Sequence, residues 1–243
     1  GIGVPQDYTE MLTWLWMAAG NGNVEAVYRI GMSYAAGDGF RQDGVEAAKW
    51  LRSAADLGYV PAMLALGNLY LTGNGVPMAY DRAFEAHMEA AEKGNAEAQF
   101  RVGAAYLTGR GTDMDGEAAL TWFSRAAEQG HAQAMYNLGN LYEKGLVVEA
   151  NASDAAEWYR RAAESGDSPG MGAYGRCLVE GTGVVADREK GLSYLRKSAE
   201  AGVAPMNRTI GRVGFPSLTA SAAFAITAVL PEPETPWITS GWA

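Results

Sequence analysis

The sequence predicts an all-α protein, a right-handed α/α superhelix (solenoid) of 36-residue helix-turn-helix repeats. Three observations support this fold class. The stretch AMLALGNLYLTGNG at 62–75 returns as AMYNLGNLYEKGLV at 134–147, two periods later. Glycine, alanine and aromatic residues recur in register every 36 residues. The apolar residues inside each unit follow the helical period of about 3.6 residues, and hairpins of this kind must stack to cover their apolar faces.

The register of the repeats divides the chain into three parts. Five full repeats are expected over 26–205, because two columns of small residues run through this range without an insertion. A half repeat of one helix is expected over 1–25, and a partial repeat with a divergent apolar segment over 206–243. The first column consists of Gly31, Gly67, Gly103, Gly139 and Gly175. The second column consists of the pairs at 54–55, 90–91, 126–127, 162–163 and 198–199.

Each repeat is expected to hold two helices. The first has apolar residues at helical spacing and ends at a glycine suited to the left-handed conformation, such as Gly73. The second begins at an Asp or Asn side chain that accepts bonds from the first free amides. The expected caps are Asp7, Asp43, Asp115, Asn151 and Asp187. Repeat two has Ala79 there, so its cap is expected to move to Asp81. Trp50 and the following alanine pair are expected to form the buried stripe, which ends at Gly58.

The glycine inside each first helix requires a reason, because an interior glycine costs about 1 kcal/mol relative to alanine. We expect Gly67 and its equivalents to let the first helix approach the alanine pair of the second helix, here Ala90 and Ala91. The tyrosine and tryptophan columns would then fill the wider gaps between neighbouring repeats. Burying one such ring contributes roughly 1.5–3 kcal/mol, which offsets the cost of the glycine.

The repeat motif resembles a known family. The pattern A-x-x-x-L-G-x-x-Y-x-x-G-x-G, followed by a second helix with W-x-x-x-A-A-x-x-G, is nearly complete in AQFRVGAAYLTGRGTDMDGEAALTWFSRAAEQG at 98–130. It resembles the Sel1-like repeat, a relative of the tetratricopeptide repeat, over about 7–214. The resemblance implies a non-enzymatic scaffold or adaptor that binds a protein or peptide, without shared catalytic residues. Departures such as Leu146 and Val147, in place of the second turn glycine, are expected to change packing only locally.

Composition and motifs argue against several other classes of protein. A formal net charge of -9 disfavours a nucleic-acid-binding protein. The stretch GDSPG at 166–170 matches the G-x-S-x-G string of hydrolases, but a helix is expected before Ser168, where a hydrolase requires a strand. His87 and His131 lack further ligands at metal-binding spacing. Cys177 is expected to be a small buried side chain. No catalytic residue, metal or cofactor is therefore expected.

Candidate partner-binding residues come from two exposed places on the first helices, which line the concave side in tetratricopeptide-like stacks. One place offers aromatic or aliphatic anchors, and the place four residues later offers groups that bind peptide amides or a carboxylate. The candidates are Tyr28, Met32, Leu64, Asn68, Phe100, Tyr136, Asn140 and Arg176. In the alternative interpretation, the anchor place only packs between adjacent first helices.

The C-terminal segment breaks the period. The stretch FPSLTASAAFAITAVL at 215–230 is apolar but short for a membrane span, and a proline-rich stretch follows it. It could cap the solenoid, dock onto a partner subunit or membrane surface, or be disordered. The candidate docking residues are Phe215, Phe224, Trp237 and Trp242. They support an alternative function, a structural accessory subunit of a larger hetero-oligomeric complex, with membrane contact confined to 215–243.

The sequence begins at Gly1, without a methionine or a basic and apolar leader. This beginning favours a processed chain of an exported or organelle-lumen protein, for example a periplasmic one, over a cytoplasmic protein.

Overall fold

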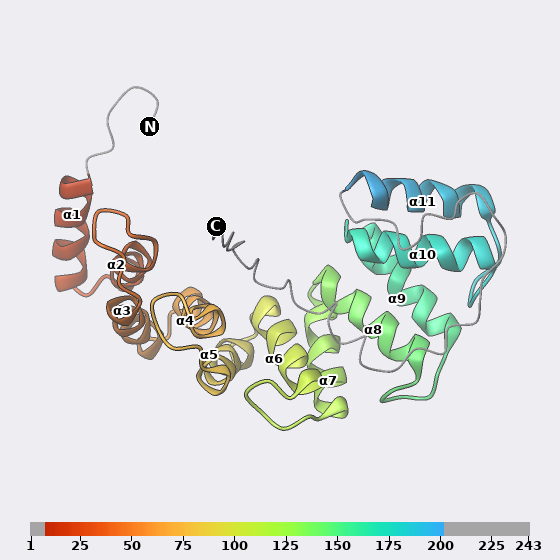
Figure 1. Ribbon diagram of the computed structural model, residues 1–243, viewed down its shortest axis with the longest axis horizontal. Helices are drawn as coiled ribbons and strands as arrows, with labels where there is room; N and C mark the ends of the chain where they lie inside the picture. The colour runs from red at the N-terminus through yellow and green to blue at the C-terminus, as the bar shows by residue number, and fades with distance from the viewer. Residues whose placement is uncertain (1–7, 202–243) are drawn as a thin grey trace, which may run out of the picture.

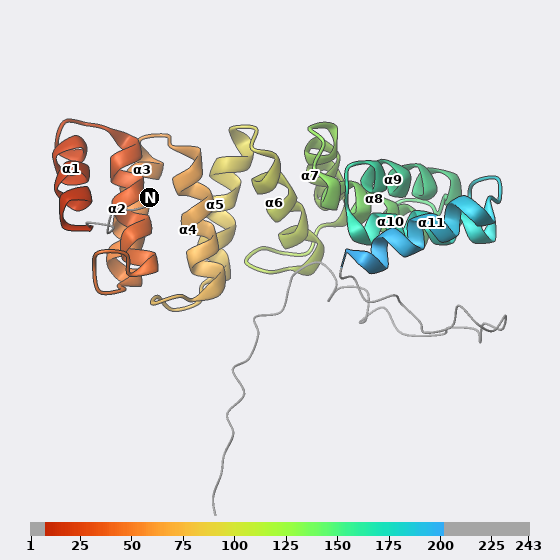
Figure 2. The same ribbon diagram turned by 90° about the horizontal axis from the view of Figure 1, so that it is seen from above.

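The computed structural model describes residues 8–201, and this part of the chain folds into eleven α-helices without a strand. The helices are α1 (Tyr8–Gly20), α2 (Val24–Ala36), α3 (Gly44–Asp56), α4 (Val60–Thr72), α5 (Tyr80–Glu92), α6 (Ala96–Thr108), α7 (Gly116–Glu128), α8 (Ala132–Lys144), α9 (Ala152–Glu164), α10 (Ser168–Glu180) and α11 (Arg188–Glu200). They follow one another in chain order along the long axis (Figure 1), and the view from above shows the same order (Figure 2). The predicted all-helical solenoid is confirmed.

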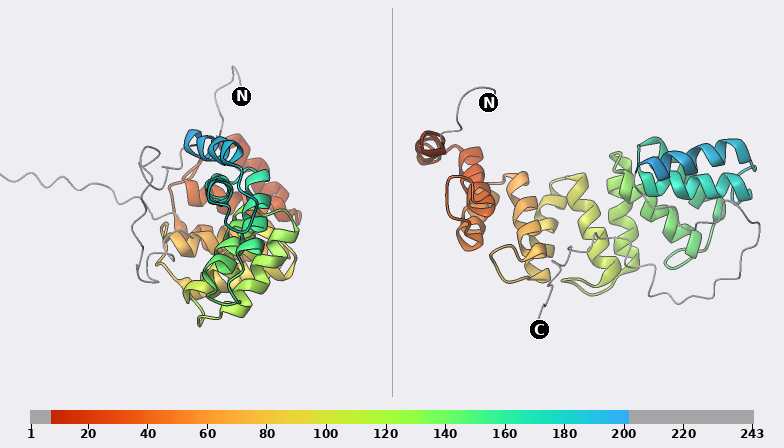
Figure 3. Two further views of the ribbon diagram at one scale, coloured as in Figure 1. Left: turned by 90° about the vertical axis from the view of Figure 1, so that its right-hand side faces the viewer. Right: turned by 45° about the horizontal axis from the view of Figure 1, so that its top comes forward.

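Ten of these helices pair into five hairpins. Within the hairpins, α2 packs against α3, α4 against α5, α6 against α7, α8 against α9 and α10 against α11. Each second helix also packs against the first helix of the next hairpin, as α3 does against α4. The hairpins therefore form one continuous array, which has a rounded cross-section when viewed from its end (Figure 3). Helix α1 occupies the place of a second helix in the 36-residue register, and it packs on α2.

Side-chain caps begin most of the second helices. Asp43 accepts hydrogen bonds from the amides of Val45 (2.9 Å) and Glu46 (3.0 Å). The same role at α7, α9 and α11 belongs to Asp115, Asn151 and Asp187. These four predicted caps are confirmed. The prediction for repeat two is wrong, because Ala79 occupies the cap position of α5 without a side-chain bond. Asp81 lies inside the first turn, where its negative charge interacts favourably with the positive end of the helix dipole.

The glycine inside each first helix packs against a large side chain of the second helix, so the predicted approach to the alanine pair is wrong. A Cβ added to Gly103 would lie 2.8 Å from the ring of Phe123, and one added to Gly139 would lie 2.5 Å from the ring of Tyr159. We call this arrangement the glycine socket. The residues that fill the five sockets are Leu51, His87, Phe123, Tyr159 and Leu195. Burial of each apolar filler contributes roughly 1.5–3 kcal/mol, more than the glycine costs.

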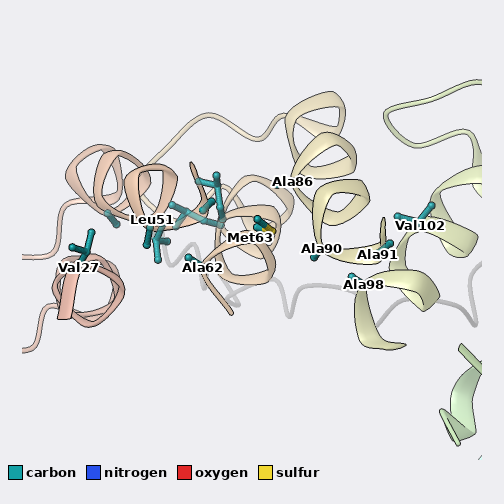
Figure 4. Close-up of a cluster of buried hydrophobic side chains, with 14 residues drawn as sticks. Val27, Leu51, Ala62, Met63, Ala86, Ala90, Ala91, Ala98 and Val102 are labelled. Carbon is teal, nitrogen blue, oxygen red and sulfur yellow. The ribbon is translucent and has the colours of Figure 1, made fainter. Parts of the chain in front are cut away.

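A hydrophobic core runs along the array between the helices. One cluster extends from Val27 in α2 to Val102 in α6 (Figure 4). The alanine pairs of repeats one to four are buried as predicted, whereas Trp50 is only half-buried. The predicted bridging of neighbouring units by aromatic rings is seen at Tyr106 and at Trp50, whose ring meets that of Trp16 in α1, whereas the other ring pairs of residues 8–201 lie within one repeat. The rings of Phe84 in repeat two and Tyr106 in repeat three meet edge to face, with centroids 5.2 Å apart.

In repeats two to five, the loop inside the repeat contacts the second helix of the preceding repeat. The loop of each repeat begins with the predicted left-handed glycine, Gly37, Gly73, Gly109, Gly145 or Gly181. At the next turn glycine there is no room for a side chain, since a Cβ on Gly111 would fall on the carbonyl oxygen of Tyr80. The equivalent pairs are Gly75 with Gly44 and Gly183 with Ala152. Repeat four reverses the arrangement, because Val147 replaces the glycine and faces Gly116.

Candidate partner-binding face

Successive first helices form one face of the array, which we call the first-helix face (α2, α4, α6, α8 and α10). Helices α2 and α4 approach each other directly, and so do α8 and α10. Between α2 and α4 the face opens into a hollow of about 330 Å³, the α2–α4 hollow. Its lining consists of Tyr28, Met32, Ala35, Leu51, Pro61, Leu64, Ala65, Asn68 and Leu69.

The α2–α4 hollow brings together four of the predicted partner-binding residues, Tyr28, Met32, Leu64 and Asn68. Met32 is 39% exposed and Asn68 is also exposed, whereas Tyr28 and Leu64 are half-buried. The flexible thioether of Met32 adapts to apolar groups of different shape, and the Asn68 amide can both donate and accept hydrogen bonds. An apolar hollow with a few polar groups at its rim suits a peptide side chain together with its backbone amide.

A pair of tyrosines lies beside the hollow. The rings of Tyr28 and Tyr59 have centroids 5.3 Å apart. Tyr59 occupies the cap position of α4 but makes no side-chain cap bond, whereas Asn23 and Asn95 cap α2 and α6. Loss of a cap costs about 1 kcal/mol, which a ring contact worth about 0.5–1.5 kcal/mol offsets. Burial raises the pKa of Tyr28, so its hydroxyl is a hydrogen-bond donor at neutral pH.

Sequence reasoning missed the other residues that line the hollow. Two of them, Ala35 and Ala65, are half-buried alanines on the two facing helices, and their small side chains leave the space open. The sequence could have indicated Ala35, because it is the smallest residue at its place in the repeat. The same place in the later repeats holds Leu71, Leu107, Glu143 and Val179. A column of large residues that is interrupted by alanine therefore marks where adjacent first helices leave a gap.

Phe100 is a core residue, and the prediction that it is an exposed anchor is wrong. Its side chain is only 3% exposed. The ring packs against Phe123 in α7, with centroids 5.9 Å apart, and stacks on the imidazole of His131 at 4.7 Å. His131 is fixed by a 3.0 Å hydrogen bond between its Nε2 and Glu97. This bond is the main reason why the pKa of Glu97 is lowered to about 2. Phe100 is therefore buried, as in the alternative interpretation, but its ring packs against α7 of the same repeat and the cap residue of α8.

The remaining predicted residues lie around Tyr159 in the C-terminal half of the face. The Tyr159 hydroxyl lies 2.9 Å from Asn140 Oδ1 and 2.8 Å from Glu143 Oε2. Tyr136 is half-buried, with its ring centroid 5.7 Å from that of Tyr159. Burial raises the pKa of Tyr159, and the exposed Arg176 opposes that shift. Asn140 and Tyr136 thus serve the packing of repeat four, while Arg176 remains available at the surface.

Replacing Tyr159 with phenylalanine, the residue that fills the socket of repeat three, is expected to lower the free energy of unfolding by about 1–2 kcal/mol. The ring still fills the socket, so the loss reports the hydroxyl, whose single proton is donated to the oxygen of Asn140 or of Glu143. Urea unfolding followed by circular dichroism measures the change. Tyr136→Phe is the matched control and should change stability by less than about 0.5 kcal/mol. Equal losses in the two variants would contradict the assignment.

Other chemistry-bearing side chains take structural places. Ser168 is the first residue of α10 and is preceded by helix α9, which confirms the context predicted for GDSPG. The thiol of Cys177 is buried as predicted, and burial raises its pKa to about 11. Within residues 8–201, no three His, Cys, Asp or Glu side chains converge in the way a metal site requires. None of the helices in this range has the length and apolar character needed to cross a membrane.

The candidate docking residues Phe215, Phe224, Trp237 and Trp242 lie outside the described residues, as does the predicted cap Asp7. Docking through 215–243 therefore stays a prediction.

The repeat geometry agrees with a family comparison. The family model described as Sel1 repeat matches residues 24–59, 60–95, 96–131, 132–167 and 168–203. This chain belongs to the Sel1 repeat family. Each Sel1 repeat begins at the first helix of a hairpin, and the first four end at the cap position of the next first helix, so the five matches correspond to the five hairpins. Sel1 repeat proteins are commonly protein-interaction scaffolds and are typically non-enzymatic.

Solved structures of Sel1 repeat proteins have the same fold. The c5321 protective antigen of uropathogenic Escherichia coli is 36% identical with a TM-score of 0.77, and the match covers 81% of this chain and 42% of that chain. A Sel1 repeat protein from Oxalobacter formigenes is 31% identical with a TM-score of 0.73, over 80% of each chain. The immunity protein PA5088 from Pseudomonas aeruginosa, at 19% identity and a TM-score of 0.51, covers 85% of this chain and 78% of that chain and shares the fold alone. A search of curated proteins found no match.

Proposed function

We propose that this Sel1 repeat protein is a non-enzymatic scaffold that binds an extended segment of a partner protein on its first-helix face, centred on the α2–α4 hollow. The observation that carries this proposal is the convergence of Tyr28, Met32, Leu64 and Asn68 on one hollow of about 330 Å³. Pockets that hold small ligands or side chains have volumes of about 300–1,000 Å³ and are mostly apolar with a few polar groups.

The chemistry of the hollow indicates the kind of contact. An apolar side chain of the partner would lie against Met32 and Leu64, which removes their exposed surface from water. The partner's backbone would pair with the Asn68 amide and the Tyr28 hydroxyl at the rim. Both groups stand on helices that are fixed by the core, so little ordering is needed before binding.

A peptide selection tests the proposal. Peptides selected from a random displayed library against the full chain are synthesised, and their dissociation constants are measured by fluorescence anisotropy. Met32→Lys should weaken binding by roughly tenfold or more, since burial of an apolar anchor is lost and a charge must be desolvated. Val45→Lys is the matched control, because Val45 is an exposed apolar residue (51%) on the second helix α3. The control should keep the affinity within about twofold. Equal effects of the two substitutions would reject the first-helix face.

The alternative function, an accessory subunit docked through 215–243, rests on the apolar run at 215–230. It predicts that the full chain associates with other subunits and that a chain ending at residue 214 does not. Copurification of the two forms, with the captured proteins identified by mass spectrometry, distinguishes this function from the adaptor.

A further inference from the structure

In repeats two to five, the loop lies over the start of the preceding second helix, and at the first two of these junctions side chains bridge the two repeats. Between repeats one and two, Gln42 Nε2 donates to Asn74 Oδ1 at 3.0 Å. Between repeats two and three, the guanidinium of Arg110 lies over the ring of Tyr80, 5.6 Å from its centroid. At both junctions the bridging groups belong to the chain itself.

The junction between repeats three and four lacks such a bridge. Gly116 stands at the place of Tyr80, and Leu146 stands at the place of Arg110. A ring is therefore missing on one side and a cation on the other. A second hollow of about 490 Å³, the loop hollow, opens at this junction. Its lining consists of Tyr106, Thr112, Asp113, Met114, Asp115, Gly116, Glu117, Leu146 and Val147.

Two apolar residues of the loop hollow are exposed. Met114 is 68% exposed and Leu146 is 58% exposed. Gly116 cannot be exchanged for a larger residue to fill the space, since its Cβ would lie 2.6 Å from Val147 Cγ2. Val147, which replaces the turn glycine, therefore requires a glycine at position 116. No ring can stand at that position, and the volume of the hollow stays open.

The rim of the loop hollow is acidic. Asp113, Asp115 and Glu117 line it, and all three are exposed. Among the ion pairs formed within residues 8–201, none involves these three carboxylates. The net charge of the whole chain, -9, adds to the negative potential around them. A partner segment that carries a positive charge beside its apolar group therefore binds the hollow more tightly than one without that charge.

We propose that the loop hollow is a second docking surface, which binds a segment of a partner protein carrying a Phe or Tyr beside Arg or Lys. The partner's ring would fill the place that Tyr80 fills in repeat two, against Met114 and Leu146. Its cationic side chain would face Asp113 and Glu117, as Arg110 supplies the cation at the preceding junction. Most of this surface is formed by the loops of repeats three and four, with Tyr106 from α6 and Gly116 and Glu117 from α7, and it shares no residue with the α2–α4 hollow.

Methyl spectra of the full chain labelled at methionine test this surface with three synthetic nonapeptides. The probe carries Arg-Phe-Lys between Gly-Ser-Gly ends, and its two controls carry Arg-Ala-Lys or Glu-Phe-Glu. The Met114 signal, assigned with Met114→Leu, should shift with the first peptide, which should bind roughly tenfold or more tightly than either control. Met78, at the same place in the bridged junction, should not shift. Equal shifts with all three peptides, no shift of Met114 at millimolar peptide, or a shift confined to Met32 would overturn the proposal.

Two variants complete the test. The triple substitution Gly116→Tyr, Leu146→Arg and Val147→Gly rebuilds the bridge of the preceding junction and should abolish the Met114 shift. Persistence of the peptide affinity in this variant would contradict the proposal. The double substitution Asp113→Asn and Glu117→Gln removes the two charges and leaves the packing intact. It provides the test if the triple variant does not fold. This pair should weaken the Arg-Phe-Lys peptide roughly tenfold, and an unchanged affinity would equally reject the docking surface.

Discussion

Replacing Gly111 with alanine is expected to lower the free energy of unfolding by roughly 3 kcal/mol. Gly111 has a φ of 81°, and its added Cβ would fall on the backbone carbonyl of Tyr80 in the preceding repeat. The left-handed conformation costs a non-glycine residue about 1–2 kcal/mol, and overpacking costs typically about 1–3 kcal/mol. The overlap cannot be relieved by a side-chain rotation, because the atom it meets belongs to the start of α5.

Gly130→Ala separates these two costs. Gly130 has a similar φ of 87°, but its added Cβ would meet nothing within 4 Å. This control should therefore lose only about 1 kcal/mol. Urea unfolding of both variants, followed by circular dichroism, gives the comparison. Losses of the same size would show that the loop contact contributes nothing to the coupling between repeats two and three.

Replacing His87 with leucine is expected to raise the free energy of unfolding by about 1–2 kcal/mol at pH 7. His87 fills the glycine socket of repeat two and is only 3% exposed, and its Nε2 finds no hydrogen-bond partner within residues 8–201. A buried polar atom without a partner costs about 1–3 kcal/mol. Leucine fills the same socket in repeats one and five without a polar atom.

The same substitution should remove part of the loss of stability in acid. The pKa of His87 is lowered from 6.5 to about 4, mainly by burial and also by the charge of Arg101, while Glu97 and the backbone of Leu64 oppose the shift. Since the folded pKa is the lower one, the unfolded chain takes up this proton first. The free energy of unfolding is therefore unaffected by this titration above pH 6.5 and falls between pH 6.5 and 4, by roughly 3 kcal/mol in total.

Unfolding free energies of the wild type and His87→Leu at pH 7, about 5.5 and 4 check this expectation, because groups common to both proteins cancel in the difference. The gap between the two curves should widen as the pH falls. Parallel curves would mean that His87 is not protonated in the unfolding transition.

The sequence was sufficient to predict the features that depend on one repeat at a time. The left-handed glycines, the caps at Asp43 and Asp115, and the buried alanine pairs follow from local conformational preferences, which repeat every 36 residues. The predicted move of the cap from Ala79 to Asp81 was wrong because packing of α5 fixes where that helix begins, whether or not a capping side chain is present.

Features that depend on two facing helices could not be predicted from the columns. The glycine socket requires knowing that Gly67 meets His87 and not the alanine pair, and this follows only from the crossing of α4 and α5. Phe100 occupies the same column as Tyr28 but is buried, since it packs between Phe123 and the imidazole of His131. Exposure at the anchor place therefore depends on surrounding helices, which a single column does not reveal.

A site-specific photo-crosslinking measurement tests the central functional claim most directly. Benzoylphenylalanine is placed at Met32 in the α2–α4 hollow or at Val45 on α3, and each protein is irradiated with a peptide selected against the full chain. Binding on the first-helix face predicts an adduct at Met32 and none at Val45, with the Met32 adduct suppressed by an excess of unlabelled peptide. A competed adduct at Val45, without one at Met32, would contradict binding on the first-helix face.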